Sequence, residues 1–227
     1  MRAALFAFGF GFAVIAACAD RTGCSSEAPV GPTLLTSPGD SAFQVVAPDS
    51  FIARFETNRG DFFVQVVREW APHGADRFYN LVRNGFYNGN RFFRVVDGFV
   101  VQWGVNGDPA VSQAWARQCI PDDPVIRPNT RPAITFAFGA PNTRTTQVFV
   151  NYGMNRRLDE SGFAPFGEII QGMSVIDSLY KGYGDGAPFG SGPDPVKLVK
   201  EGNAYLDREF PLVDSIVHAR IVAERRP

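Results

Sequence analysis

Histidine and cysteine are both scarce in this chain of 227 residues. Only His73 and His218 carry imidazole groups, which argues against a histidine-based metal site or a nucleophile–histidine triad. The three cysteines form an odd set, so their positions are more informative than their number. We therefore expect no bound metal, and we also expect no cofactor.

The net charge is also small, at −1. A surface that binds RNA or DNA normally carries a stripe of lysine and arginine, and the sequence contains none, so we expect no nucleic-acid partner. The composition is otherwise that of a globular protein, with 45% hydrophobic and 20% charged residues. Phenylalanine occurs 21 times, and this aromatic richness favours strands over helices.

The first 18 residues have the order of a signal peptide. Arg2 precedes an apolar run from Ala3 to Ala17, and small residues stand directly before Cys18. The run is shorter than the ~20 apolar residues that a membrane-spanning helix needs. The pattern predicts that the protein is exported.

The end of this signal, Ile15-Ala16-Ala17-Cys18, is also similar to a bacterial lipobox. We therefore expect Cys18 to be lipidated after cleavage, which would anchor the protein to a membrane in the periplasm or at the cell surface. The alternative is ordinary cleavage near Ala17 or Ala19, with Cys18 incidental.

Residues 19–49 are rich in Ala, Ser, Pro, Gly and Thr and show no sustained period, which predicts a flexible tether. Cys24 lies in this segment and is either unpaired or paired with Cys119 in an oxidising compartment. The texture changes near residue 50. Residues 50–227 are predicted to form one domain that includes a C-terminal extension.

Short runs rich in Phe and Val, separated by Gly, Pro and Asn, predict a β-barrel or sandwich in this domain. Two helices are expected among the strands, because apolar residues recur there at helical spacing. The strands are expected at 52–57, 62–67 and 215–222, the helices from 71 to 85 and from 172 to 180, and a Gly/Pro-rich loop at 182–195.

A hairpin motif spans residues 91–102, RFFRVVDGFVVQ, with Asp97-Gly98 as its turn signal. Two registers are open. In a two-residue loop Arg94 faces Val101 and Gln102 points the other way. In a three-residue loop with Gly98 left-handed, Arg94, Val100 and Gln102 share one face, which brings a guanidinium and an amide together beside an apolar wall.

Two further motifs follow the hairpin. They read TFAFGAPNT with QVFVN, at 135–143 and 147–151, and LDESGFAPFG, at 158–167. Taken together, in this order and spacing, the motifs resemble the cyclophilin family, in particular its bacterial exported members. The resemblance covers roughly residues 51–182. It implies a mainly β fold, a closed eight-stranded antiparallel barrel capped by two α-helices.

The resemblance also implies site residues. It makes Arg94 the catalytic arginine, with Gln102 fixing the substrate carbonyl or orienting the guanidinium. The proline pocket would be lined by Phe99, Val100, Phe149, Leu158 and Phe163, and the peptide backbone flanked by Gln102, Ala137, Phe138 and Gln147. This sequence departs from the family by Asp97 for proline, Val100 for methionine, Phe138 for asparagine, and Phe93 and Phe163 for histidines.

The implied activity is peptidyl-prolyl cis–trans isomerisation that assists the folding of exported proteins. Its partners would be proline-containing unfolded or flexible polypeptides, and the protein would act as a monomer. The reaction needs no nucleophile and no metal, because rotation only has to overcome the partial double bond of the amide. An arginine is protonated at any physiological pH and can donate to the twisted nitrogen.

Other readings remain open. The implied proline pocket could belong to a proline-peptide-binding module or holdase with little turnover. The aromatic residues could instead line the open interior of an exported barrel that binds a small molecule. A nucleophilic role for Cys119 is poorly supported, since neither histidine lies in a suggestive context.

Overall fold

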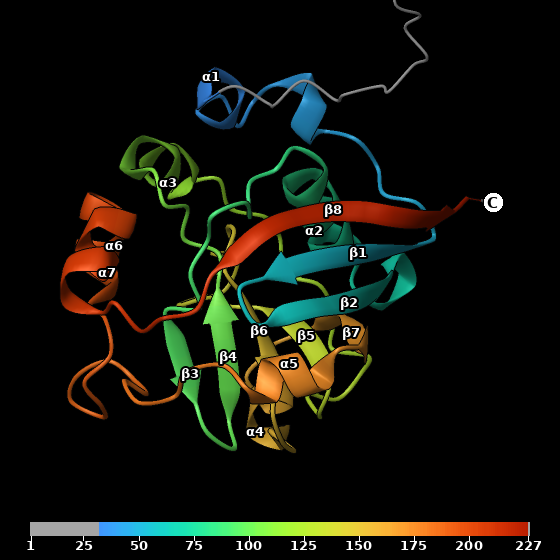
Figure 1. The fold of residues 1–227 in the computed structure, drawn as a ribbon. Helices are drawn as coiled ribbons and strands as arrows, with labels where there is room; N and C mark the ends of the chain where they lie inside the picture. Colours follow the sequence, from blue (N-terminus) through green and yellow to red (C-terminus); the bar gives the residue numbers. More distant parts are fainter. Residues whose placement is uncertain (1–31, 227) are drawn as a thin grey trace, which may run out of the picture.

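The computed structural model describes residues 32–226. Its centre is one eight-stranded antiparallel sheet in the order β3-β4-β6-β5-β7-β2-β1-β8 (Figure 1). The strands are β1 (Ser50–Thr57), β2 (Gly60–Val67), β3 (Arg94–Val96), β4 (Val100–Trp103), β5 (Ala133–Phe136), β6 (Val148–Asn151), β7 (Pro165–Gln171) and β8 (Ile216–Arg225). The predicted fold class, mainly β with eight antiparallel strands, is confirmed.

The sheet curls until its two edges meet. The chain just before β3 bonds with the chain at the start of β8: Phe92 N donates to Asp214 O at 3.0 Å, and Ile216 N donates to Asn90 O at 2.8 Å. These bonds satisfy backbone groups that an open sheet edge would leave exposed. They also fix the position of β3.

Aromatic rings fill the inside of the curled sheet. Phe55, Phe62 and Trp103 are fully buried, with ring centroids 4.9 to 6.0 Å apart. Phe78, from helix α2, adds a ring 6.0 Å from Phe55. Rings at these separations pack against one another. The packed interior contradicts the hypothesis of an open ligand-binding barrel.

Both predicted helices are present. Helix α2 (Pro72–Arg83) has proline in its first turn and buries Phe78 and Leu81, and Gly85 follows it at φ 72°. Helix α5 (Met173–Asp177) is shorter than expected. Beyond its end, Tyr180 N donates to the Asp214 carboxylate at 2.7 Å and not to a carbonyl of the helix.

Several short helices were not predicted. They are α1 (Pro32–Leu35), α3 (Pro109–Trp115), α4 (Arg156–Glu160), α6 (Pro195–Glu201), α7 (Asn203–Glu209) and the 3₁₀ turns Ser41–Phe43 and Arg68–Trp70. Helices α6 and α7 form a second, smaller core, in which Leu198 and Tyr205 cluster with Phe93 next to β3. None of the helices within residues 32–226 is long and apolar enough to cross a membrane.

The prediction of a flexible tether is wrong for residues 34–49. Phe43 is buried with its ring edge-on to Trp115, at a centroid distance of 4.9 Å, and the Trp115 indole N–H donates to Leu35 O at 2.8 Å. Ala47 N donates to Asp76 of α2 at 2.9 Å. Isolated side chains anchor this segment, so its sequence has no repeating apolar pattern that would have predicted an ordered structure.

The rest of the N-terminal predictions lie outside the described residues. These are the signal peptide, the lipidation of Cys18, and residues 19–31 of the tether with Cys24. Cys119 is exposed and follows α3. Its pairing with Cys24 is untested, because Cys24 lies outside the described residues.

Candidate functional site

The hairpin of β3 and β4 presents one polar face. Arg94 pairs with Gln102 and Val96 with Val100, which leaves Asp97-Gly98-Phe99 as the loop. Gly98 has a φ of 68°, a left-handed conformation that glycine adopts without strain. The three-residue register is therefore the one formed, and it places Arg94 and Gln102 side by side.

A chain of side-chain hydrogen bonds runs from Arg94 across the sheet. The Arg94 Nη1 donates to Gln102 Oε1 at 3.1 Å, and Gln102 Nε2 donates to Gln147 Oε1 at 2.9 Å. Gln147 directly precedes β6, the strand that pairs with β4. Both amide orientations are thus fixed by the guanidinium, which can only donate.

Arg94 has a second partner that no sequence motif indicated. Its Nε and Nη2 donate to the two carboxylate oxygens of Asp185, at 2.7 and 2.8 Å. The hydrogen bonds from Arg94 lower the pKa of the Asp185 carboxyl. Asp185 lies in the Gly/Pro loop, 91 residues along the chain, and no local pattern connects it with the hairpin.

Aromatic rings form the other side of the site. The Arg94 guanidinium lies 5.6 Å from the Phe99 ring centroid. Phe163 meets Phe149 edge-on at 5.8 Å and stacks on Phe138 at 4.1 Å. The structure thus joins three of the residues that the resemblance implied in one aromatic wall, close to the polar chain.

The remaining predicted residues support these two walls. Val100 is buried in β4. Ala137 N donates to Gln147 O at 2.9 Å, so this pair extends the ladder of β5 and β6. Leu158 lies half-buried on α4, and its carbonyl accepts from Phe163 N at 3.0 Å. Each predicted residue therefore lies on β3 to β6 or on the segment from α4 to β7.

An ion pair between a buried arginine and a more exposed aspartate lies behind the aromatic wall, and it was missed from the sequence. The Arg144 side chain is only 2% exposed and pairs with Asp122, and its Nη2 donates to Gly162 O at 2.6 Å. Its guanidinium lies 4.5 Å from the Phe138 ring centroid. Burial lowers the pKa of Arg144. This arginine fixes Phe138 and the turn that carries Phe163.

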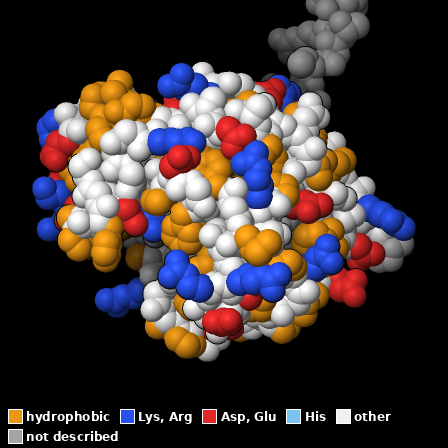
Figure 2. Space-filling model, turned by 90° about the horizontal axis from the view of Figure 1, so that it is seen from below, with side chains coloured by type: hydrophobic (Ala, Val, Ile, Leu, Met, Phe, Trp, Pro, Cys, Tyr) orange, Lys and Arg blue, Asp and Glu red, His pale blue; other side chains and the backbone are white. Residues whose placement is uncertain are grey.

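The arrangement combines one oriented cation with an apolar surface. It offers donors to an oxygen or a nitrogen lone pair, and rings on which an apolar group can pack. Among residues 32–226 no group of three or more His, Cys, Asp or Glu side chains could hold a metal ion. On the face shown in Figure 2, basic, acidic and apolar side chains are interspersed.

Known proteins match over most of the domain. The family model described as cyclophilin type peptidyl-prolyl cis-trans isomerase/CLD matches residues 52–200. Peptidyl-prolyl cis-trans isomerase B of Escherichia coli (strain K12) is 28% identical over 179 residues, which cover 75% of this chain and 98% of the relative. A peptidyl-prolyl cis-trans isomerase of Acinetobacter baylyi is 32% identical over 133 residues, covering 56% of this chain and 71% of the relative.

Solved structures agree on the fold. A cyclophilin type peptidyl-prolyl cis-trans isomerase of Cryptosporidium parvum has a TM-score of 0.57 at 19% identity, covering 77% of this chain and 99% of that one. The same protein crystallised in the presence of the dipeptide Ala-Pro has a TM-score of 0.56 at 20% identity, covering 76% and 99%. With its fold and with a family model that spans most of its length, this chain belongs to the cyclophilin-type peptidyl-prolyl cis–trans isomerases.

Proposed function

We propose that this protein catalyses cis–trans isomerisation of X–Pro bonds in exported polypeptides, with Arg94 as the catalytic donor. The observation that carries the proposal is the position of Arg94. Its guanidinium is held between Gln102 and Asp185 and lies beside the Phe99 ring. The crystals of a structural neighbour grown with Ala-Pro support a proline-containing ligand.

The reaction is limited by amide resonance, which imposes a barrier of about 18–20 kcal/mol. Rotation about the bond breaks this resonance and leaves a lone pair on the proline nitrogen. A donor aimed at that lone pair stabilises the twisted state more than either planar state, and such a difference is what accelerates a reaction. The rings of the aromatic wall would hold the proline and keep water away, which strengthens the hydrogen bond.

The guanidinium keeps donors free for this task. It carries five N–H groups, of which Asp185 accepts two and Gln102 accepts one. The two that remain belong to Nη1 and Nη2. They are available for the carbonyl oxygen or the nitrogen of a bound X–Pro bond.

An isomerase assay on the purified protein tests this function. A proline-containing peptide, whose trans form alone is cut by chymotrypsin, should be cleaved faster when the protein is added. The alternative, a proline-binding module or holdase, requires saturable binding of the same peptide without any acceleration. That outcome would show that the protein is a binding module and not an enzyme.

We propose further that the protein is a lipoprotein outside the cytoplasm, anchored through Cys18. The support is the order of charge, apolar run and small residues before that cysteine. Cys18→Ala should release the protein from the membrane fraction and prevent labelling by a lipid precursor. A variant that stays in the membrane fraction, or a mature N-terminus elsewhere, would contradict the anchor.

A further inference from the structure

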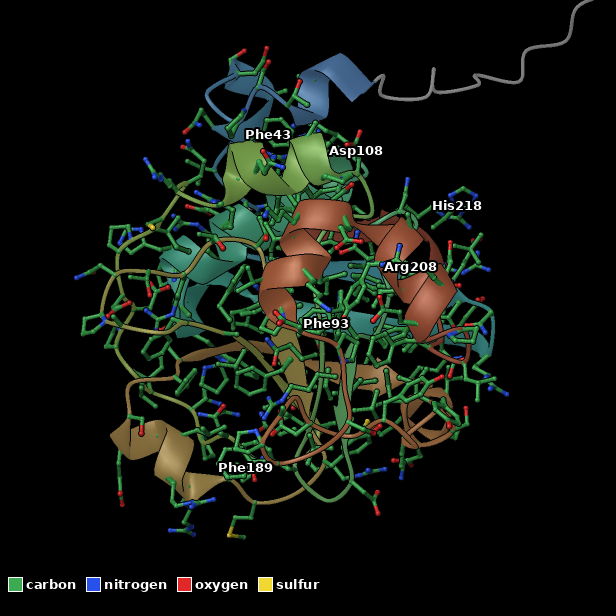
Figure 3. The ribbon with its side chains drawn as sticks, turned by 90° about the vertical axis from the view of Figure 1, so that its left-hand side faces the viewer. Phe43, Phe93, Asp108, Phe189, Arg208 and His218 are labelled. Atoms are coloured by element: carbon green, nitrogen blue, oxygen red, sulfur yellow. The ribbon has the colours of Figure 1, made fainter. Side chains whose placement is uncertain are left out.

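The proposed reaction assigns no role to the Gly/Pro-rich loop of residues 182–195. It lies between α5 and α6, beside β3 (Figure 1). Backbone bonds close it on itself: Gly192 N donates to Asp185 O at 2.7 Å, and Ser191 N to Tyr183 O at 3.2 Å. Asp194 ends the loop by capping α6. Figure 3 looks onto this loop, with Phe189 labelled near its lower end.

The loop is folded tightly around Asp185. A Cβ placed on Gly190 would lie 2.3 Å from the Asp185 carbonyl oxygen, so only glycine permits this approach. The Asp185 side chain is also held from within the loop, because its Oδ1 accepts from Gly186 N at 2.8 Å. The carboxylate that meets Arg94 is therefore fixed by its own surroundings.

The geometry of the ion pair favours orientation over stability. The side chains of Arg94 and Asp185 are each 27% exposed, and a pair so close to solvent contributes little to the free energy of unfolding. Two parallel N–H···O bonds do, however, fix the plane of a guanidinium. Gln102 adds a third bond at the opposite nitrogen, so rotation of the plane would break several bonds together.

We propose that Asp185 is a positioning residue for Arg94, which holds the guanidinium plane so that its two free N–H groups meet the twisting X–Pro bond. The proposal rests on the function proposed above. The carboxylate accepts from Nε and from one N–H of Nη2, and with Gln102 on Nη1 it leaves one N–H free on each terminal nitrogen. Its role is thus to aim the donor, and its loss should lower turnover more than peptide binding.

Two variants of Asp185 test this in the full protein. Asp185→Ala removes the pair, and Asp185→Asn keeps an oxygen for Gly186 N while it loses the charge and places an amide opposite Nη2. We expect kcat to fall roughly ten- to a hundredfold in Asp185→Ala, the scale of a misplaced catalytic group. We expect a smaller fall in Asp185→Asn. The Kd of an uncleaved proline peptide, measured by calorimetry, should change less than about twofold.

Asp207→Ala is the matched control. It removes an Arg–Asp pair from the neighbouring Arg91, at 2.8 Å, without touching Arg94. Its kcat should equal that of the parent. The Nε–H signal of Arg94 in a ¹⁵N NMR spectrum gives a readout independent of activity, and it should shift in both Asp185 variants but stay in place in Asp207→Ala.

A double-mutant cycle separates positioning from a general effect of the loop. In an Arg94→Ala background, Asp185→Ala should cause no further loss of kcat. A further loss, an unchanged kcat in Asp185→Ala alone, or a kcat that rises because the carboxylate competes with substrate, would each overturn the proposal. If Arg94→Ala itself keeps parental activity, the catalytic arginine is wrong, and this result is distinct from a failure of Asp185.

Discussion

The two walls of the site are built in different ways. On one side, Arg94, Gln102 and Asp185 are joined by directed hydrogen bonds, and their side chains come from two neighbouring strands and one distant loop. On the other side, Phe138 and Phe163 are held by ring contacts, with a buried arginine behind them. Directed bonds fix where a charge points, whereas rings offer a surface that accepts several ligand shapes.

This difference assigns separate tasks to the two walls. A donor that acts on the twisted bond contributes to the transition state alone, and its loss appears in kcat. An apolar surface that holds the proline ring binds the planar and the twisted states alike, and its loss appears in KM. Substitutions on each wall can therefore test whether the separation holds.

The largest expected effect is that of Arg94→Ala. A charge-assisted hydrogen bond contributes about 1.5–3 kcal/mol, so kcat should fall roughly 10- to 150-fold. Arg94→Lys should restore little, because an ammonium cannot reproduce the planar fork. Protease-coupled kinetics measure the change, and melting temperatures check that each variant is folded.

Arg91→Ala is the control for this variant. Arg91 also lies in the 91–102 motif, but its partner is Asp207 of α7 rather than Gln102. It should keep the parental kcat. A folded Arg94→Ala variant with near-parental turnover would show that Arg94 is not catalytic. It would favour the hypothesis of a proline-binding module.

A smaller effect, on KM, is expected from the aromatic wall. Phe163→Ala removes the ring that contacts both Phe138 and Phe149. Since an aromatic contact contributes about 0.5–1.5 kcal/mol, KM should rise roughly 2- to 12-fold with kcat little changed. Phe163→Leu, which keeps an apolar side chain, should recover part of the loss. A fall in kcat at unchanged KM would show that the aromatic wall also acts on the transition state, so that the two walls do not have separate roles.

The smallest effect concerns pH. The pKa of Asp185 is lowered below its ordinary value of 3.8 by Arg94. A carboxyl whose pKa is lowered by folding stabilises the fold at any pH above its pKa in the unfolded chain. This stabilisation is lost as the pH falls through its pKa in the folded protein. The difference in unfolding free energy between parent and Asp185→Asn should thus be constant at neutral pH and shrink in acid below about pH 4. Chemical denaturation measures it, and a difference that changes between pH 6 and 8 would contradict the assignment.

Sequence patterns predicted contacts within the hairpin of Arg94 better than contacts between elements that lie far apart along the chain. The hairpin motif identified Arg94 and Gln102 as neighbours, but it left two registers open, because the length of the loop depends on a left-handed Gly98. Asp185 and the buried Arg144 were missed. Their partners lie far away along the chain, and a single arginine or aspartate carries no local sign of its partner.

The two ends of the domain show the same limit. β1 and β8 were expected as strands from their apolar texture, and they form near the expected residues. The segment 34–49 lacked such texture and yet packs on α2 and α3, through partners such as Trp115 and Asp76. Periodicity detects faces that repeat, whereas a segment held by isolated anchors becomes visible only in three dimensions.

The pairing of β1 with β8 also governs when the protein can fold. β1 begins at Ser50, and its partner β8 ends at Arg225, so one edge of the first strand stays open until nearly the whole chain has been synthesised. Helix α2 is also bonded to this strand, because the Tyr79 hydroxyl donates to Glu224 at 2.7 Å. Domains whose early segments pair with one another can fold during translation. Here the strand that completes the sheet comes last, so a chain that stops before residue 216 would lack the partner of β1.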